Sequence, residues 1–262
     1  NGGSASVIYS EVTGNKGLAG GGIHHDGASL TLLYTTLGDN IADGIEGGGG
    51  LMVQQGDVQI LNSLIVDNGT YTVDTGNGGG LRVLGGSVTI INTAISANDN
   101  LNTKNPVGAG ILAEGGSVTL INATVADHPD GGALYQTGTA TITGGNTLFS
   151  NNDGSSCVGP IEDLGNNLEY PPTSCGFTLN ALLEDPLMLP LDYNGGPTLA
   201  YTLEVTSPAI DAGNIDLLPE DTFDLDGYGD TTEKIPFEQR GDGFARLLDN
   251  GIDIGSIEQA LP

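Results

Sequence analysis

The 262-residue chain contains no tryptophan, few other aromatic residues and only six Lys and Arg residues. These six stand against 33 Asp and Glu residues, which gives a formal net charge of −27 at pH 7. Nucleic acid binding requires clusters of basic residues that neutralise phosphates, so the composition excludes that function. An anionic membrane surface is disfavoured for the same reason. The chain also lacks an apolar run of the roughly 18 residues that a transmembrane segment requires.

Cysteine is equally scarce, with only Cys157 and Cys175 in a polar, turn-rich stretch. Because no His or third Cys lies nearby, a zinc site is disfavoured and a single disulfide is predicted. A disulfide in turn indicates an oxidising compartment. The chain begins Asn1-Gly2-Gly3, without the charged and apolar regions of a signal peptide. We therefore expect any export signal to have been removed or to lie upstream.

Glycine is abundant, with 44 residues, but it clusters beside Val, Ile and Leu and has no triplet period, which excludes collagen. Instead, two short motifs alternate along the first 150 residues. The first motif occupies 29–37, 57–65, 87–95 and 117–125, with weaker copies at 4–12 and 139–149. The second motif begins with glycine and occupies 20–27, 48–56, 78–86, 108–116 and 131–138. Each repeat therefore predicts three short strands separated by turns.

The alternation within each repeat points aliphatic residues to one side and polar residues to the other. The residues expected to point inward include Val58, Ile60, Val88, Ile90, Val118 and Leu120, then Val12, Leu37, Ile65, Ile95 and Val125, and on the glycine-led strand Ile23, Leu51, Leu81, Ile111 and Leu134. One repeat alone has too few aliphatic residues to bury a face. Residues 1–150 therefore predict a parallel β-helix of about five to six stacked coils with one continuous core.

Three asparagines, Asn62, Asn92 and Asn122, fall at the same point of successive repeats, where the second strand should bend into the third. Asn tolerates the left-handed backbone conformation, and stacked amides can hydrogen-bond to one another along the axis. We interpret them as a structural ladder rather than as ligands.

The variable loops at 38–47, 66–77 and 96–107 all occupy the third turn. They carry Asp39, Asp43, Glu46, Asp67, Asp74 and Asp99, which predicts an acidic, solvated flank.

After about residue 150 the repeat stops and five motifs follow in order. They are GNNLEYPPTSCGF (165–177), NGGPTLAYTLEVTSPAIDAGN (194–214), DLDGYGD (224–230), FEQRGDGFAR (237–246) and GIDIGSIE (251–258). In this order they resemble the C-terminal module of the choice-of-anchor Q family of exported bacterial proteins. The resemblance implies an all-β fold in which a right-handed parallel β-helix (solenoid) is followed by a β-rich capping module at 151–262. It also implies secretion and a location outside the bacterium or on its surface, but no reaction.

The third of these motifs spaces oxygen donors as an EF-type calcium loop does, with Asp224, Asp226, Tyr228 and Asp230 at positions 1, 3, 5 and 7. Tyr228 offers only its backbone carbonyl, and the twelfth position is not acidic, although Glu233 is close enough to substitute. The alternatives are a calcium site formed by these five residues and an acidic β-turn without a metal.

Arg240 and Arg246 lie within the fourth motif, surrounded by acidic residues. We expect them to pair with Asp211 or nearby carboxylates and to fix the module in place.

Because many parallel β-helices host polysaccharide lyases and glycosidases, the outward side of the glycine-led strand is a candidate glycan face. The candidate residues on it are His24, Arg82, Glu114 and Tyr135. Arg82 and Glu114 lie on neighbouring coils and should pair, which leaves no cluster of carboxylates for acid–base catalysis. His24 and His25 should point to opposite faces and so cannot share a metal.

The first coil begins at its second strand, so we expect Val7 and Ile8 to lie on an open edge that can pair with another molecule. The hypothesis is that the C-terminal module of one copy docks there, which would propagate a head-to-tail filament. The sequence thus predicts a non-catalytic, exported structural or adhesion protein. The alternative is a carbohydrate-active β-helix, either an enzyme or a glycan-binding module.

Overall fold

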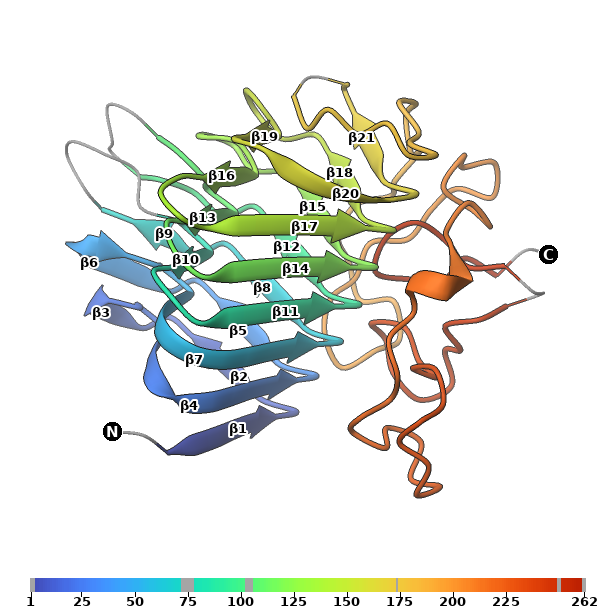
Figure 1. The fold of residues 1–262 in the computed structure, drawn as a ribbon, viewed down its shortest axis with the longest axis horizontal. Helices are drawn as coiled ribbons and strands as arrows, with labels where there is room; N and C mark the ends of the chain where they lie inside the picture. Colours follow the sequence, from blue (N-terminus) through green and yellow to red (C-terminus); the bar gives the residue numbers. More distant parts are fainter. Residues whose placement is uncertain (1–2, 72–77, 102–105, 173, 249–250, 261–262) are drawn as a thin grey trace.

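The computed structural model describes residues 3–71, 78–101, 106–172, 174–248 and 251–260, and these form a parallel β-helix with a C-terminal module packed against it (Figure 1). In Figure 1 the front strands run from left to right and each coil lies above the preceding one, so the helix is right-handed. Parallel pairing links every pair of neighbouring strands in its sheets. The predicted fold class is therefore confirmed.

Three sheets make up the walls of the helix. The eleven-stranded sheet contains β1 (Ser4–Ile8), β4 (Ile23–Leu33), β7 (Leu51–Leu61), β10 (Leu81–Val83), β11 (Ser87–Ile91), β13 (Ile111–Ala113), β14 (Ser117–Ile121), β16 (Leu134–Gln136), β17 (Thr141–Gly145), β19 (Cys157–Val158) and β20 (Ile161–Gly165). The seven-stranded sheet contains β2 (Glu11–Thr13), β5 (Thr36–Gly38), β8 (Leu64–Val66), β12 (Ala94–Ser96), β15 (Thr124–Ala126), β18 (Leu148–Ser150) and β21 (Leu168–Tyr170). The third sheet contains β3 (Lys16–Ala19), β6 (Ile41–Gly47) and β9 (Gly69–Thr70).

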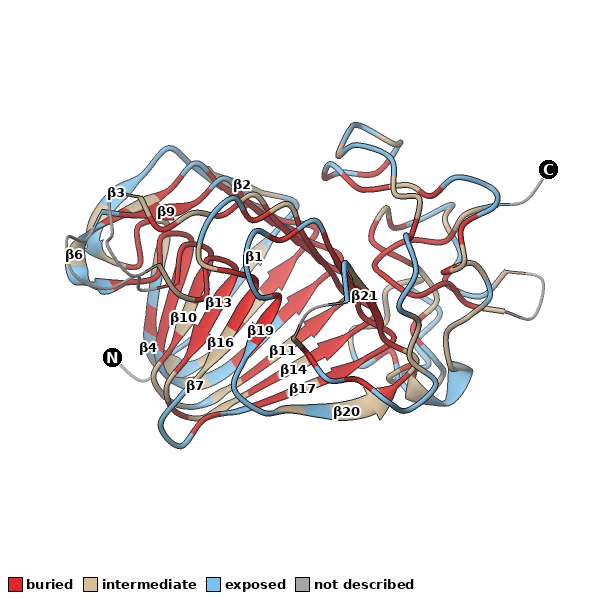
Figure 2. Ribbon diagram, turned by 90° about the horizontal axis from the view of Figure 1, so that it is seen from above, coloured by how far each residue is buried: buried red, intermediate tan, exposed pale blue. Residues whose placement is uncertain are grey.

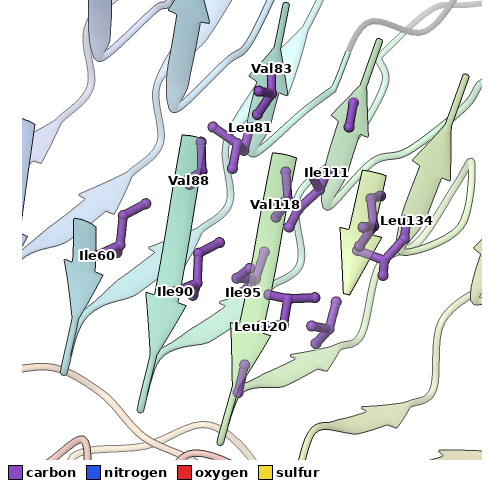
Figure 3. Packing of buried hydrophobic residues seen from close by; sticks show 14 of the residues in the cluster. Ile60, Leu81, Val83, Val88, Ile90, Ile95, Ile111, Val118, Leu120 and Leu134 are labelled. Carbon is purple, nitrogen blue, oxygen red and sulfur yellow. The ribbon is translucent and has the colours of Figure 1, made fainter. Parts of the chain in front are cut away.

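The core is a set of aliphatic columns that run along the helix axis (Figure 3). In the front sheet, Ile60 lies opposite Ile90, which lies opposite Leu120. The glycine-led strands align Leu51, Leu81, Ile111 and Leu134, and the seven-stranded sheet aligns Leu37, Ile65, Ile95 and Val125. All of these residues are buried, as the alternation predicted. The aliphatic residues of one coil are buried by the equivalent residues of the coils above and below it. The core therefore depends on the register between neighbouring coils.

A buried polar ladder runs beside these columns, at the turn that follows the seven-stranded sheet. Asn40 Nδ2 donates to Asn68 Oδ1 at 3.0 Å, and Asn68 Nδ2 donates to Asn98 Oδ1 at 2.9 Å. The same oxygens accept the backbone N–H groups of Asn40 and Asn68. Since every rung is buried, each amide is satisfied by the coil above or below it.

The glycine triplets of the repeat make room for this ladder. A Cβ atom on Gly50 would lie 3.0 Å from the side-chain amide of Asn68, and one on Gly80 would lie 3.0 Å from that of Asn98. Contacts this short, together with closer ones to neighbouring backbone, exclude a larger residue. The asparagine ladder therefore requires the glycine triplets, because only glycine leaves space for the side-chain amides.

The predicted ladder of Asn62, Asn92 and Asn122 is wrong in its contacts, although these residues do adopt the left-handed conformation, with φ values of 49°, 47° and 50°. Their side chains do not bond to one another. Asn62 and Asn92 instead donate to the backbone carbonyl of Phe237 in the C-terminal module. The physical reason is position, because these turns face the module and not the interior of the helix.

The parallel ladder extends past residue 150, where the sequence repeat fades, because β19, β20 and β21 pair with β16, β17 and β18. The next described residues, 171–172 and 174–182, close this end of the core. Phe177 packs against Phe149 with ring centroids 5.4 Å apart, and Leu182 bridges to Leu168. The predicted disulfide between Cys157 and Cys175 is confirmed and ties this segment to β19.

Most of the module lies along one side of the coils (Figures 1 and 2). Among the described residues after 171 it contains isolated β-bridges and the short 3-10 helix η1 (Ile215–Leu217). Outward aliphatic residues of the front sheet, Leu33, Leu61, Ile91 and Ile121, pack against Leu218, Ile235 and Ile252 of the module. Tyr201 packs on the outer face of β8, β12 and β15 and donates a 2.6 Å hydrogen bond to Asp127 Oδ2. The module therefore covers a side of the helix as well as its end.

His128 occupies the ladder position that follows Asn98. Its Nδ1 accepts the backbone N–H of Asn98 at 3.1 Å, and the backbone N–H of His128 donates to Asn152 Oδ1 at 3.3 Å. The imidazole is fully buried, and this burial lowers the pKa of His128 from 6.5 to about 4. The ring is therefore neutral in the folded chain at neutral pH.

The replacement His128→Asn should make the protein more resistant to acid. Because the folded pKa is depressed, the unfolded chain binds a proton that the folded chain does not, so stability falls as pH drops from about 6.5 to about 4. The loss attributable to His128 is roughly 3 kcal/mol by pH 4. Urea unfolding of both proteins between pH 7.5 and 4 measures the difference. Parallel pH curves for the variant and the wild type would contradict this assignment.

Candidate functional site

The five residues of the predicted calcium loop are only partly brought together. Asp224 Oδ1 accepts the N–H of Gly229 at 2.8 Å, and Asp230 Oδ1 accepts the N–H of Thr232 at 2.9 Å. Tyr228 is largely exposed. The carboxylates of Asp224 and Asp230 therefore stabilise turns of the loop itself.

A different acidic group forms beside this loop. Carboxylate oxygens of Asp221, Asp226 and Glu233 all lie within 4.8 Å of one another. Asp221 is buried and accepts the N–H groups of Phe223 and Leu225, while Glu233 Oε1 has no hydrogen bond with a described residue. Three hard oxygen donors at this separation could hold a metal ion.

The pKa values in this group rise for an electrostatic reason. Burial raises the pKa of Asp221, and the charges of Asp226 and Asp224 add to the rise. Desolvation followed by the charges of Asp226 and Asp230 raises the pKa of Glu233. The cluster thus contains mutual repulsion that a bound cation would relieve. The spacing of the calcium-loop motif does not include Asp221, because this residue lies three positions before the first residue of the motif. Its acidic side chain so close to the motif was the available signal.

The predicted glycan face is not a single site. His24 and Tyr135 occupy equivalent positions in β4 and β16, but Met52, Arg82 and Leu112 lie between them in the ladder. At about 4.8 Å per coil the two residues are about 19 Å apart. His24 is exposed while His25 is buried, which confirms that they face opposite sides.

Arg82 and Glu114 pair as predicted, with Arg82 Nη2 lying 2.6 Å from Glu114 Oε2. The Nη1 group of Arg82 also donates to the backbone carbonyls of Ile45 and Glu46. The guanidinium therefore ties β6 to the neighbouring coils, and its hydrogen bonds are directed at the scaffold.

The acidic flank lies along the turn after the seven-stranded sheet. A groove of about 450 Å³ is lined there by Asp39, Asp67, Asp99 and Asp127 together with Ile41 and Leu101. Burial, reinforced by the charge of Asp39, raises the pKa of Asp67. Asp74 lies outside the described residues.

Arg240 and Arg246 anchor the module, but their partners are Glu238 and Glu258 and not Asp211. Arg240 Nε lies 2.8 Å from Glu238 Oε1, and Arg246 Nε lies 3.2 Å from Glu258 Oε1. Arg246 is completely buried and donates to the carbonyls of Asp253 and Gly255. Burial raises the pKa of Glu258 to about 8, and the charge of Arg246 opposes that shift.

No family model, curated protein or solved structure matches the chain. Among the residues described, no helix is long and apolar enough to cross a membrane. Inference about function therefore depends on the fold and on the contacts of individual side chains.

The replacement Arg246→Ala should destabilise the protein by about 3–5 kcal/mol, because it removes the hydrogen bonds to the carbonyls of Asp253 and Gly255 and leaves Glu258 buried without its partner. The matched control is Lys16→Ala, which removes the exposed 2.8 Å pair with Asp43 and should cost at most about 1 kcal/mol. Urea unfolding at pH 7.5 measures both changes. Equal costs for the two variants would show that the buried pair does not hold the module.

Proposed function

We propose that this chain is a non-catalytic, exported structural or adhesion element of a bacterial surface or extracellular assembly. The observation that carries the proposal is that the described Lys and Arg side chains are held in contacts with other parts of the protein. Each Lys and Arg that the structure describes is engaged with the scaffold: Lys16 with Asp43, Arg82 with Glu114, Lys234 with the carbonyl of Leu218, Arg240 with Glu238 and Arg246 with Glu258. A lyase requires a basic group that is free to accept a proton from substrate. Exposed His24 lies outside these pairs but is four rungs from Tyr135 in the ladder, so the contacts favour a scaffold over the alternative of a carbohydrate-active enzyme.

Two further observations support an extracellular location. The disulfide between Cys157 and Cys175 is typical of oxidising compartments. The five C-terminal motifs keep their resemblance to the choice-of-anchor Q family, whose members are exported. Membership of that family is part of the proposal.

The same proposal includes head-to-tail association of copies. At one end of the helix, Ile8 is 48% exposed and Leu18 is 77% exposed. Near the other end, in the residues that follow β21, Leu179 and Leu183 are 52% and 50% exposed. Apolar residues at both ends of a rigid rod suit a heterologous contact, which propagates unless it closes.

The replacement Ile8→Asp should abolish this association and leave the rod folded. Ile8 is the better choice for the test, because Val7 packs against the core and its replacement risks unfolding. The control is Ile45→Asp, which changes an 85% exposed side chain on β6. Electron microscopy and sedimentation velocity of the untreated protein measure assembly. Fibres that persist in Ile8→Asp, or monomeric wild-type protein at high concentration, would overturn the filament while leaving the scaffold role intact.

Calcium is proposed as the ion of the group formed by Asp221, Asp226 and Glu233. At a hundredfold excess over Kd, bound calcium should stabilise the folded protein by about 2.7 kcal/mol. The melting temperature should rise accordingly. Asp226→Asn should remove most of this effect, because the amide keeps the Oδ1 acceptor for Tyr228 N–H but loses the charge. Asp216→Asn changes an exposed acid of η1 that lies outside this group, and it is the control. Identical melting curves with calcium and with chelator would contradict the assignment.

A further inference from the structure

A cavity of about 310 Å³ lies where three successive coils enter their glycine-led strands. Its lining includes Val107, Asp130, Tyr135, Asp153, Ser155 and Val158. Val107 precedes β13, Tyr135 belongs to β16 and Val158 belongs to β19, and these three strands pair in that order. The cavity therefore runs along the axis of the helix across three coils.

The lining combines an aromatic ring, apolar walls and free hydrogen-bond acceptors. Tyr135 is half-buried, and Val107 and Val158 add apolar surface beside it. Asp130 and Asp153 are exposed, and no described residue donates a hydrogen bond to either carboxylate. A site with one aromatic surface and a few polar groups that fix orientation is typical of small-ligand binding.

These chemical features match a saccharide. A pyranose ring has an apolar C–H face that packs on an aromatic ring, and its edge carries hydroxyl groups that donate to carboxylates. The net charge of −27 and the two aspartates repel uronic acids and sulfated sugars. The cavity crosses three coils spaced by about 4.8 Å, so its lining extends along the axis.

We propose that this cavity binds a neutral saccharide chain, with a sugar ring stacked on Tyr135 and hydroxyl groups donating to Asp130 and Asp153. Of the four residues that the sequence assigned to a glycan face, only Tyr135 belongs to this site. Arg82 and Glu114 are committed to each other, and His24 is four rungs away in the ladder. The inference goes beyond the structural role proposed above and does not depend on assembly.

The test is isothermal titration calorimetry with cellohexaose, mannohexaose, maltohexaose and chitohexaose, and with oligogalacturonate as the anionic comparison. We expect at least one neutral hexaose to bind and oligogalacturonate to fail. Tyr135→Ala should weaken binding by about tenfold or more, since each tenfold corresponds to about 1.4 kcal/mol. The double replacement Asp130→Asn with Asp153→Asn should weaken it further, because the amide oxygens accept less strongly than carboxylates.

Tyr193→Ala is the matched control, because Tyr193 is an exposed tyrosine of the module outside this cavity. Thermal melting of each variant separates loss of binding from loss of fold. Absence of millimolar binding by all four neutral hexaoses would overturn the proposal. Equal affinity of Tyr135→Ala and wild type, or tighter binding of oligogalacturonate, would also overturn it. None of these results would affect the head-to-tail association, which microscopy and sedimentation velocity test separately.

Discussion

The structure depends on the register between successive coils. No coil buries its own aliphatic face, so Ile60, Ile90 and Leu120 form a core only when their strands pair residue for residue. The asparagine ladder fixes this register from inside, because a slip would leave buried amides unpaired at about 1–3 kcal/mol each. The glycine triplets are part of the same constraint, since they admit the amides.

The C-terminal module adds a second layer whose internal support is ionic. Arg246 and Glu258 are buried together, and Arg240 stacks over Phe244 while it pairs with Glu238. In a chain with so few cations, this concentration of basic residues in the scaffold leaves an acidic exterior. That exterior keeps rods apart unless a specific contact or a bound cation offsets the repulsion. The electrostatics thus connect stability to the proposed assembly and calcium sites.

The repeat made the inner half of the structure predictable. Period-two alternation in four similar copies located the inward columns, the strand order and the coil spacing, and the lone pair of cysteines located the disulfide. The sequence predicts the ladder at Asn62, Asn92 and Asn122, because these residues lie in the most regular motif. The true ladder of Asn40, Asn68 and Asn98 lies at the start of variable loops, where the recurring Asp-Asn pairs at 39–40 and 67–68 were a usable signal.

The module was less predictable, because it has no period and its contacts join residues far apart in the chain. A signal was present in the paired aliphatics at the end of each front strand, such as Ile60-Leu61 and Ile90-Ile91. Two adjacent apolar residues on a strand face opposite sides, so the outer one indicates a covering layer. No sequence pattern marks Asp221, Asp130 or Asp153 as site residues. Only the fold brings Asp221 to Asp226 and Glu233, and only the fold brings Asp130 and Asp153 to one cavity.

The most direct test of this account is native-state hydrogen exchange, resolved by residue. If the ladder sets the register of a single cooperative rod, the amides of Asn40, Asn68 and Leu81 should exchange only through global unfolding. The opening free energies calculated from their exchange rates should then equal the free energy of unfolding measured with urea. Exchange of the ladder amides through local opening, well below that free energy, would contradict the claim that this buried row holds the structure together.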